Sequence, residues 1–147
     1  MFDFLLQNFS YPVLFLVSFL SSTLLPLASE AFVLGFVKLD FNVYFVLFIA
    51  SFGNVLGSLS TYALAYFGKE KILKKYFQKA LKKLEKLDMN FKKFGAFFAF
   101  LSFLPLIGDI FVLGLGFAKY NFYKTALFIA LGKLSRYTFI IFLANLI

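Results

Sequence analysis

Four ionisable side chains of this chain lie within long apolar stretches: Glu30, Asp109, Lys133 and Arg136. Charged groups are costly inside a membrane and usually have a function there. Lys133 and Arg136 are three residues apart, so both project from one face of a helix. An arginine beside a lysine suits a phosphate group, because the guanidinium forms bidentate hydrogen bonds and the ammonium acts as a point charge. This pattern predicts an anion-binding site at Arg136 and Lys133.

The two acids suit proton exchange, because a carboxylic acid held within a membrane can gain and lose a proton. We therefore assign proton coupling to Glu30 and Asp109. Asn54 joins the candidate binding residues, since an amide at mid-membrane needs a partner and could face a cavity. The opposite interpretation stays open, because two acids and two bases can also form a closed set of ion pairs that only neutralises buried charge.

Both acids occur in copies of one repeated stretch. Residues 25–35 and 104–114 share Leu-Pro-Leu, an acid and Phe-Val-Leu-Gly in register, 79 positions apart. A repeat of this kind outweighs any single motif. A further match, between residues 47–50 and 127–130, runs one position out of phase. The chain therefore consists of two related halves, each with an acid in a hydrophobic segment that a proline interrupts.

Composition places the chain in a membrane. Of its 147 residues, 62% are hydrophobic and 22% aromatic, and its mean hydropathy is +0.89. A soluble domain of this length could not hide so much apolar surface, whereas lipid accepts it. The sequence has no Cys and no His, which removes the usual zinc and iron ligands, a thiol nucleophile and the commonest neutral-pH base. We expect no metal, no cofactor and no enzymatic activity.

Each half is predicted to contain a re-entrant hairpin, which enters and leaves the membrane on one side. Residues 13–25, with Pro12 in the first turn, make a helix of roughly 20 Å against a hydrocarbon core of about 30 Å. Residues 94–104 are equally short in the second half. The predicted breaks between the hairpin limbs are at Pro26, Pro105 and Gly108.

Each hairpin is followed by a stretch long enough to cross the membrane, at residues 42–67 and 122–147. A single crossing per half turns the second half upside down, which is an inverted-topology repeat typical of transporters. The predicted fold is a single all-α integral membrane domain with repeat 1 at about residues 11–67 and repeat 2 at about 94–147.

Residues 68–93 join the halves and hold ten of the fifteen basic residues. Apolar residues recur there every three or four positions, which predicts a basic amphipathic helix at 69–93. Such a helix lies on an anionic leaflet, and the positive-inside rule makes this linker cytoplasmic. It carries no nucleic-acid recognition motif, so we expect no nucleic-acid partner.

Two further features concern the first half. Gly53 and Gly57 are four residues apart and predict close helix packing. The N-terminal segment lacks the basic start of a signal peptide, because the first lysine is Lys38, so we expect it to remain in the mature protein.

Several motifs together identify a family resemblance: Ser22-Thr23-Leu24-Leu25-Pro26 with Ser29-Glu30, Gly53-Asn54-x-x-Gly57, Leu104-Pro105-x-x-Gly108-Asp109 and Gly132-Lys133-x-x-Arg136-Tyr137. They resemble the short YqaA-like branch of the DedA family, within the superfamily of VTT-domain, or SNARE-associated Golgi, membrane proteins. The resemblance covers nearly the whole chain from about residue 15, with the motifs in order and spacing.

The resemblance implies a multi-pass protein of the bacterial inner membrane with two opposed re-entrant hairpins. For characterised relatives it implies translocation of undecaprenyl phosphate or phospholipids, in some cases dependent on the proton gradient. By position, Glu30 and Asp109 match the hairpin acids and Arg136 matches a basic residue of the family. Longer DedA proteins carry additional arginines and flanking helices, whereas this chain has one Arg.

The leading hypothesis is a proton-linked translocase, or flippase, whose partners are membrane lipids with a phosphate head group. Two alternatives stay open: a proton-coupled carrier of a small anion, and a non-transporting factor for membrane assembly or integrity. An intramembrane enzyme has the least support, because no nucleophile constellation is recognisable. A homo-oligomer is left open.

Overall fold

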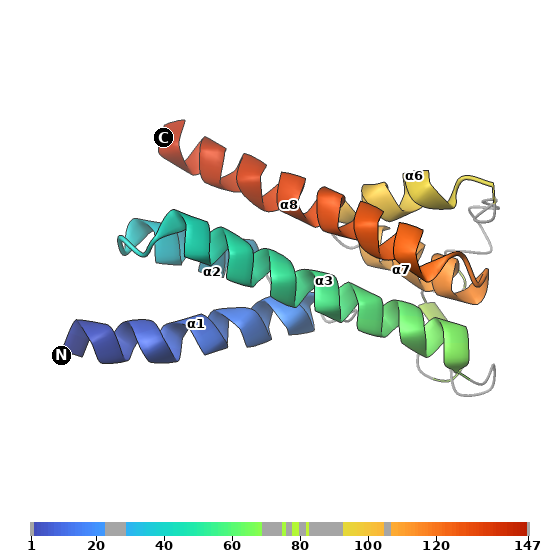
Figure 1. Cartoon of the computed structure of the whole chain (residues 1–147), viewed down its shortest axis with the longest axis horizontal. Helices are drawn as coiled ribbons and strands as arrows, with labels where there is room; N and C mark the ends of the chain where they lie inside the picture. The colour runs from blue at the N-terminus through green and yellow to red at the C-terminus, as the bar shows by residue number, and fades with distance from the viewer. Residues whose placement is uncertain are drawn as a thin grey trace.

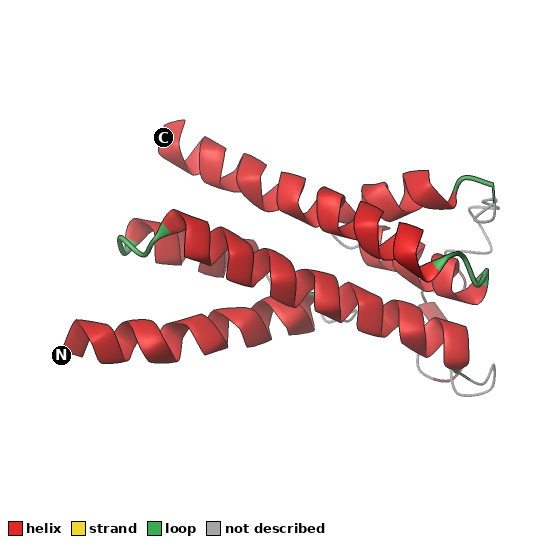
Figure 2. Cartoon of the chain, viewed as in Figure 1, coloured by secondary structure: helices red, strands yellow, loops and turns green. Residues whose placement is uncertain are grey.

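The computed structural model describes residues 2–22, 29–68, 75, 78, 79, 82, 93–104 and 107–146, and all their regular structure is helical (Figure 2). The first half contains α1 (Phe2–Ser21), α2 (Ser29–Lys38) and α3 (Val43–Phe67). The second half contains α6 (Gly95–Phe100), the 3-10 helix η1 (Leu101–Phe103), α7 (Ile107–Phe117) and α8 (Phe122–Leu146). The all-helical prediction is confirmed for these residues.

Two helices, α3 and α8, are each 25 residues long and apolar enough to cross a membrane. Large apolar side chains are exposed along both of them, among them Phe48 and Phe52 on α3 and Phe139 and Phe142 on α8. So many exposed large apolar side chains fit lipid better than water. Length, composition and surface together agree with the predicted membrane class.

The shorter helices form two pairs that lie at opposite ends of the molecule (Figure 1). α1 runs toward the middle and α2 returns from it, while α6 and α7 do the same from the other end. α1 packs against α3, and α6 with η1 packs against α8. The second helix of each pair packs against the long helix of the other half, α7 against α3 and α2 against α8. The starts of α2 and α7, which carry the two acids, therefore lie near the middle.

The repeat is visible in the bounds of the long helices. α8 begins and ends 79 positions after the first and last residues of α3. The 79-position register of the hairpins thus continues to the end of each half. The two helices are equal in length and keep the 79-position register at both ends, so the out-of-phase match at residues 47–50 and 127–130 involves no net insertion.

The turn before each long helix repeats in the same register. Asp40 and Lys119 are the two non-glycine residues with positive φ in the described chain, at 61° and 53°. The next residue in each turn, Phe41 or Tyr120, donates its N–H to the carbonyl five positions back, at 3.1 Å in both cases. This is the Schellman ending of a helix. The two halves therefore share backbone geometry as well as sequence.

The N-terminal helix differs from the prediction. α1 begins at Phe2, and Pro12 lies inside it rather than in its first turn. Proline removes the bond to the carbonyl of Asn8, but Asn8 is exposed and the N-terminus lies beyond the α2–α3 turn (Figure 1), so that carbonyl can be solvated. The part of α1 that packs beside the rest of the first half begins near Tyr11, whose ring contacts Phe41 at 5.6 Å.

Several predictions lie outside the described residues. The hairpin breaks at Pro26 and Pro105 are among them, and so is most of the 69–93 linker helix. Within that linker the structure describes four residues with helical backbone and exposed side chains, namely Lys75, Gln78, Lys79 and Lys82. The amphipathic helix stays a prediction.

Candidate functional site

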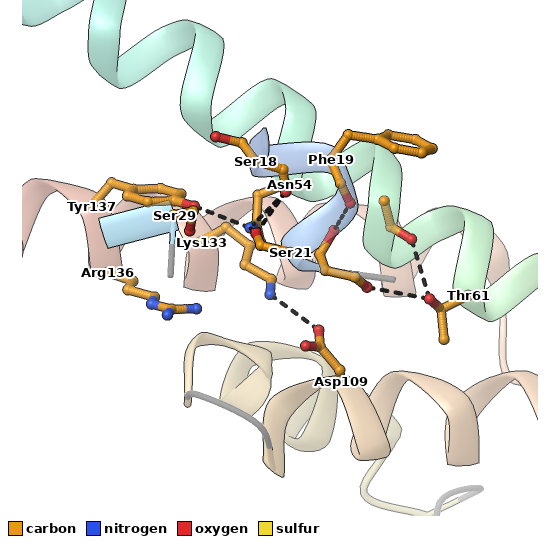
Figure 3. Close-up of polar contacts among 12 residues, drawn as sticks. Ser18, Phe19, Ser21, Ser29, Asn54, Thr61, Asp109, Lys133, Arg136 and Tyr137 are labelled. Carbon is orange, nitrogen blue, oxygen red and sulfur yellow. Dashed lines mark hydrogen bonds and ion pairs between the residues drawn. The ribbon is translucent and has the colours of Figure 1, made fainter. Parts of the chain in front are cut away.

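α8 brings both predicted bases to the middle of the molecule, where each faces an acid from a different hairpin. Lys133 Nζ lies 3.5 Å from Asp109 Oδ1 at the start of α7 (Figure 3). Lys133 is 1% exposed and Asp109 13%. We call Lys133 and Asp109 the inner pair. Because one charge alone would be very costly at this depth, each partner compensates the other.

The second pair is more accessible. Arg136 forms an ion pair with Glu30 in the first turn of α2, and these side chains are 15% and 29% exposed. The Arg136 guanidinium also lies 5.9 Å from the centre of the Tyr137 ring. We call Glu30 and Arg136 the outer pair. It links α8 of the second half to the hairpin of the first half.

Asn54 and Tyr137 belong to a hydrogen-bonded network beside the outer pair (Figure 3). The hydroxyl of Tyr137 lies 2.8 Å from that of Ser29, and Asn54 Nδ2 donates to the Tyr137 hydroxyl at 3.0 Å. Asn54 Nδ2 also donates to the Ser18 carbonyl at 3.1 Å and to Ser21 Oγ at 2.9 Å. The network joins α1, α2 and α3 to α8, so it fixes the hairpin end from which Glu30 projects.

A cavity of about 630 Å³ opens beside the outer pair. Glu30 comes from α2, and α6, η1 and α8 supply the remaining lining residues: Phe100, Phe103, Ser135, Arg136, Phe139 and Ile140. One wall therefore carries an acid and a base, whereas most of the rest is aromatic or aliphatic. This lining suits an amphiphile, whose polar head would meet the outer pair while an apolar chain lies against the phenylalanines.

Only some of the predicted site residues line this cavity. Glu30 and Arg136 are part of its described lining, whereas Lys133, Asp109 and Asn54 lie outside it. Within the part of the chain that the structure describes, no group of three acidic side chains could hold a metal ion. The groups that this arrangement brings to the cavity are a permanently charged guanidinium, which can bind an anion, and a carboxyl group, which can carry a proton.

Glycines allow the hairpins to lie close to the long helices. A Cβ on Gly53 would lie 2.7 Å from the Phe15 carbonyl oxygen of α1, and one on Gly57 would overlap the Phe19 carbonyl oxygen. In the second half Gly132 faces the Phe100 carbonyl in the same manner. Gly108, predicted as a hairpin break, lies in the first turn of α7 against the Ser102 backbone.

Sequence reasoning missed the partners of Asn54. Ser18 and Ser21 are small polar residues in an apolar helix, three positions apart and therefore on one face, which is the signal that could have pointed to them. Tyr137 follows Arg136 directly in the Gly132-Lys133-x-x-Arg136-Tyr137 motif, but nothing in the motif predicts its hydrogen bonds. Its partner Ser29 lies 108 positions earlier, a separation that no local pattern spans.

Known proteins match this chain over almost its full length. The VTT domain matches residues 21–146, which include both ion pairs and the cavity lining. A protein of Haemophilus influenzae, described only as uncharacterized, is 33% identical over 140 residues, which covers 90% of this chain and 85% of that protein. No solved structure matches.

Proposed function

The chain belongs to the VTT-domain family, and on that premise we propose that it is a transporter that moves a lipid phosphate across the bacterial inner membrane. The observation that carries the proposal is the cavity of about 630 Å³ with the outer pair in its wall. An arginine and an acid at the edge of an apolar cavity match the two parts of a lipid, a charged head group and hydrocarbon tails.

The proposed mechanism is an exchange of partners at Arg136. When Glu30 takes up a proton it loses its charge, which releases the guanidinium to bind the phosphate by bidentate hydrogen bonds. The tails lie against Phe100, Phe103 and Phe139 or remain in the bilayer. Loss of the proton restores the outer pair and expels the head group, so proton movement drives the cycle.

The proposed membrane arrangement follows from the charges at the two ends of the molecule. Lys93, Lys119 and Lys124 are exposed at the end where α6 and α8 begin, which the positive-inside rule makes cytoplasmic. The α2–α3 turn with Lys38 and Asp40 then lies on the other side. The two hairpins are re-entrant from opposite faces, and the basic linker at 68–93 lies on the anionic cytoplasmic leaflet.

The apolar cavity lining also favours a lipid over a small soluble anion. A soluble anion would need polar groups around most of its surface. Apart from Glu30 and Arg136, the described lining residues are Phe100, Phe103, Ser135, Phe139 and Ile140. Of these, Ser135 alone carries a side-chain polar group. We therefore prefer lipid translocation to the anion-carrier alternative.

The test is lipid flipping in proteoliposomes that contain wild-type protein, Arg136→Ala or Glu30→Gln. Fluorescent polyprenyl phosphate and an ordinary phospholipid are assayed in parallel, with and without an imposed pH gradient. We expect wild-type flipping that Arg136→Ala reduces at least about tenfold, since a charged hydrogen-bond partner is lost, and that no longer responds to the gradient in Glu30→Gln. If well-folded wild-type protein moves neither lipid, the translocase proposal is wrong.

A further inference from the structure

We infer that the two ion pairs have different tasks: the outer pair exchanges partners during transport, whereas the inner pair is a fixed tether that holds the second hairpin on α8. The transport part of this inference rests on the proposed function. The tether part concerns folding and can be tested without it. The inference removes Asp109 and Lys133 from the groups to which the sequence assigned proton coupling and substrate binding.

Access distinguishes the two pairs. Glu30 and Arg136 are part of the cavity lining and are 29% and 15% exposed. Lys133 is 1% exposed and lies outside that lining, as does Asp109. A head group in the cavity would therefore meet the outer pair first. To reach Lys133 it would have to separate this fully buried ammonium from Asp109, which is more costly than opening a pair of which both members line the cavity.

The repeat gives an independent argument for the tether. Lys133 lies 79 positions after Asn54, so the two residues occupy the same place on the two long helices. Asn54 Nδ2 binds the first hairpin through the Ser18 carbonyl and Ser21 Oγ. Lys133 binds the second hairpin through Asp109. The same position thus holds a hairpin in both halves, once with an uncharged amide and once with an ion pair.

Arg136 of the outer pair has no counterpart in the first half, although Glu30 is equivalent to Asp109 in the repeat. Arg136 lies 79 positions after Gly57, which has no side chain and instead packs against the α1 backbone. An element that both repeats share fits a task in the common fold, whereas an element present in one repeat fits a task that the fold does not require. This asymmetry places the exchange at Arg136 and the tether at Lys133.

The test compares two neutral double variants of the full chain. Asp109→Asn with Lys133→Gln replaces the inner pair by amides, as at Asn54, and Glu30→Gln with Arg136→Gln does the same for the outer pair. We expect each inner single variant to melt at a lower temperature, because it leaves one buried charge alone, and the inner double variant to recover that loss. The inner double variant should flip lipid at the wild-type rate, whereas the outer double variant should be folded and lose flipping at least about tenfold.

Three outcomes would overturn the inference. A folded inner double variant without flipping would show that the inner pair takes part in transport. Inner single variants as stable as wild type would show that it is no tether. A second inner double variant, Asp109→Leu with Lys133→Met, replaces the pair by apolar side chains in case the amides pack poorly. If neither the amide nor the apolar inner double variant folds, the protein requires the two charges themselves for folding. If wild-type protein moves no lipid, the proposed function fails and the melting temperatures alone decide the tether.

Discussion

At the scale of single residues, the hydroxyl of Tyr137 holds a position that no other described side chain duplicates. It contacts Ser29 at the start of α2 and accepts a hydrogen bond from Asn54 on α3. Tyr137 is 0% exposed, so neither contact can be replaced by bulk water. Ser29, next to Glu30, is thus bonded to Tyr137, next to Arg136, so this contact helps to position both members of the outer pair.

Replacing Tyr137 by Phe should therefore destabilise the protein. The change removes one hydroxyl and leaves the buried Ser29 hydroxyl without its bond to Tyr137, which costs about 1 kcal/mol. Asn54 keeps the Ser18 carbonyl and Ser21 Oγ as acceptors for its two N–H hydrogens. The measurement is the melting temperature in detergent. Tyr123→Phe is the matched control, because Tyr123 is 81% exposed and should melt as wild type does. Equal melting temperatures for both variants would contradict the role given to the network.

Local patterns in the sequence indicated the relative placement of some individual side chains. The spacing of Lys133 and Arg136 places both on one side of α8, and the repeat indicated that the acids are equivalent. It did not reveal which base meets which acid, because Glu30 and Arg136 are 106 positions apart and pair only once α2 packs on α8. The separation into an accessible and a buried pair depends on that packing, and no pattern in the sequence encodes it.

At the scale of elements, contact between α1 and α3 depends on the two glycines of α3. Gly57→Ala should destabilise the protein by about 1–3 kcal/mol, because the added Cβ would overlap the Phe19 carbonyl oxygen and push the helices apart. Gly35→Ala is the matched control within α2, since nothing lies within 4 Å of a Cβ there. Thermal unfolding of the two variants measures the difference. A Gly57→Ala protein as stable as Gly35→Ala would show that α1 and α3 can separate without cost.

Helix boundaries were the least predictable elements. Apolar length correctly indicated α3 and α8, because a 25-residue apolar stretch has few other structures available in a membrane. Pro12 misled the prediction for α1, since a proline inside a helix is tolerated where the freed carbonyl can be solvated. The Schellman turns at Asp40 and Lys119 were also missed, because neither residue is the glycine or asparagine that usually marks a left-handed helix ending.

At the scale of the whole molecule, the two ends should lie on opposite sides of the membrane. The protein has no natural cysteine, so Lys38→Cys and Lys119→Cys can be labelled individually in intact cells with an impermeant thiol reagent. Both lysines are exposed, at the two turns that precede α3 and α8. We expect labelling of position 38 from outside the cell and of position 119 only after the membrane is opened. Labelling of both from the same side would exclude the inverted arrangement.

The shared turn geometry bears on how such a protein could arise. A half-length ancestor with one hairpin and one long helix could not enclose the cavity alone, because Glu30 comes from one half and the other described lining residues come from the second. It would have needed a second copy of itself to complete the cavity. Gene duplication and fusion would then have joined the two copies and allowed equivalent positions to diverge, to Asp40 in one turn and Lys119 in the other. Fusion also permits a mutation in one copy alone, so equivalent positions of the two long helices can differ, as Gly57 and Arg136 do.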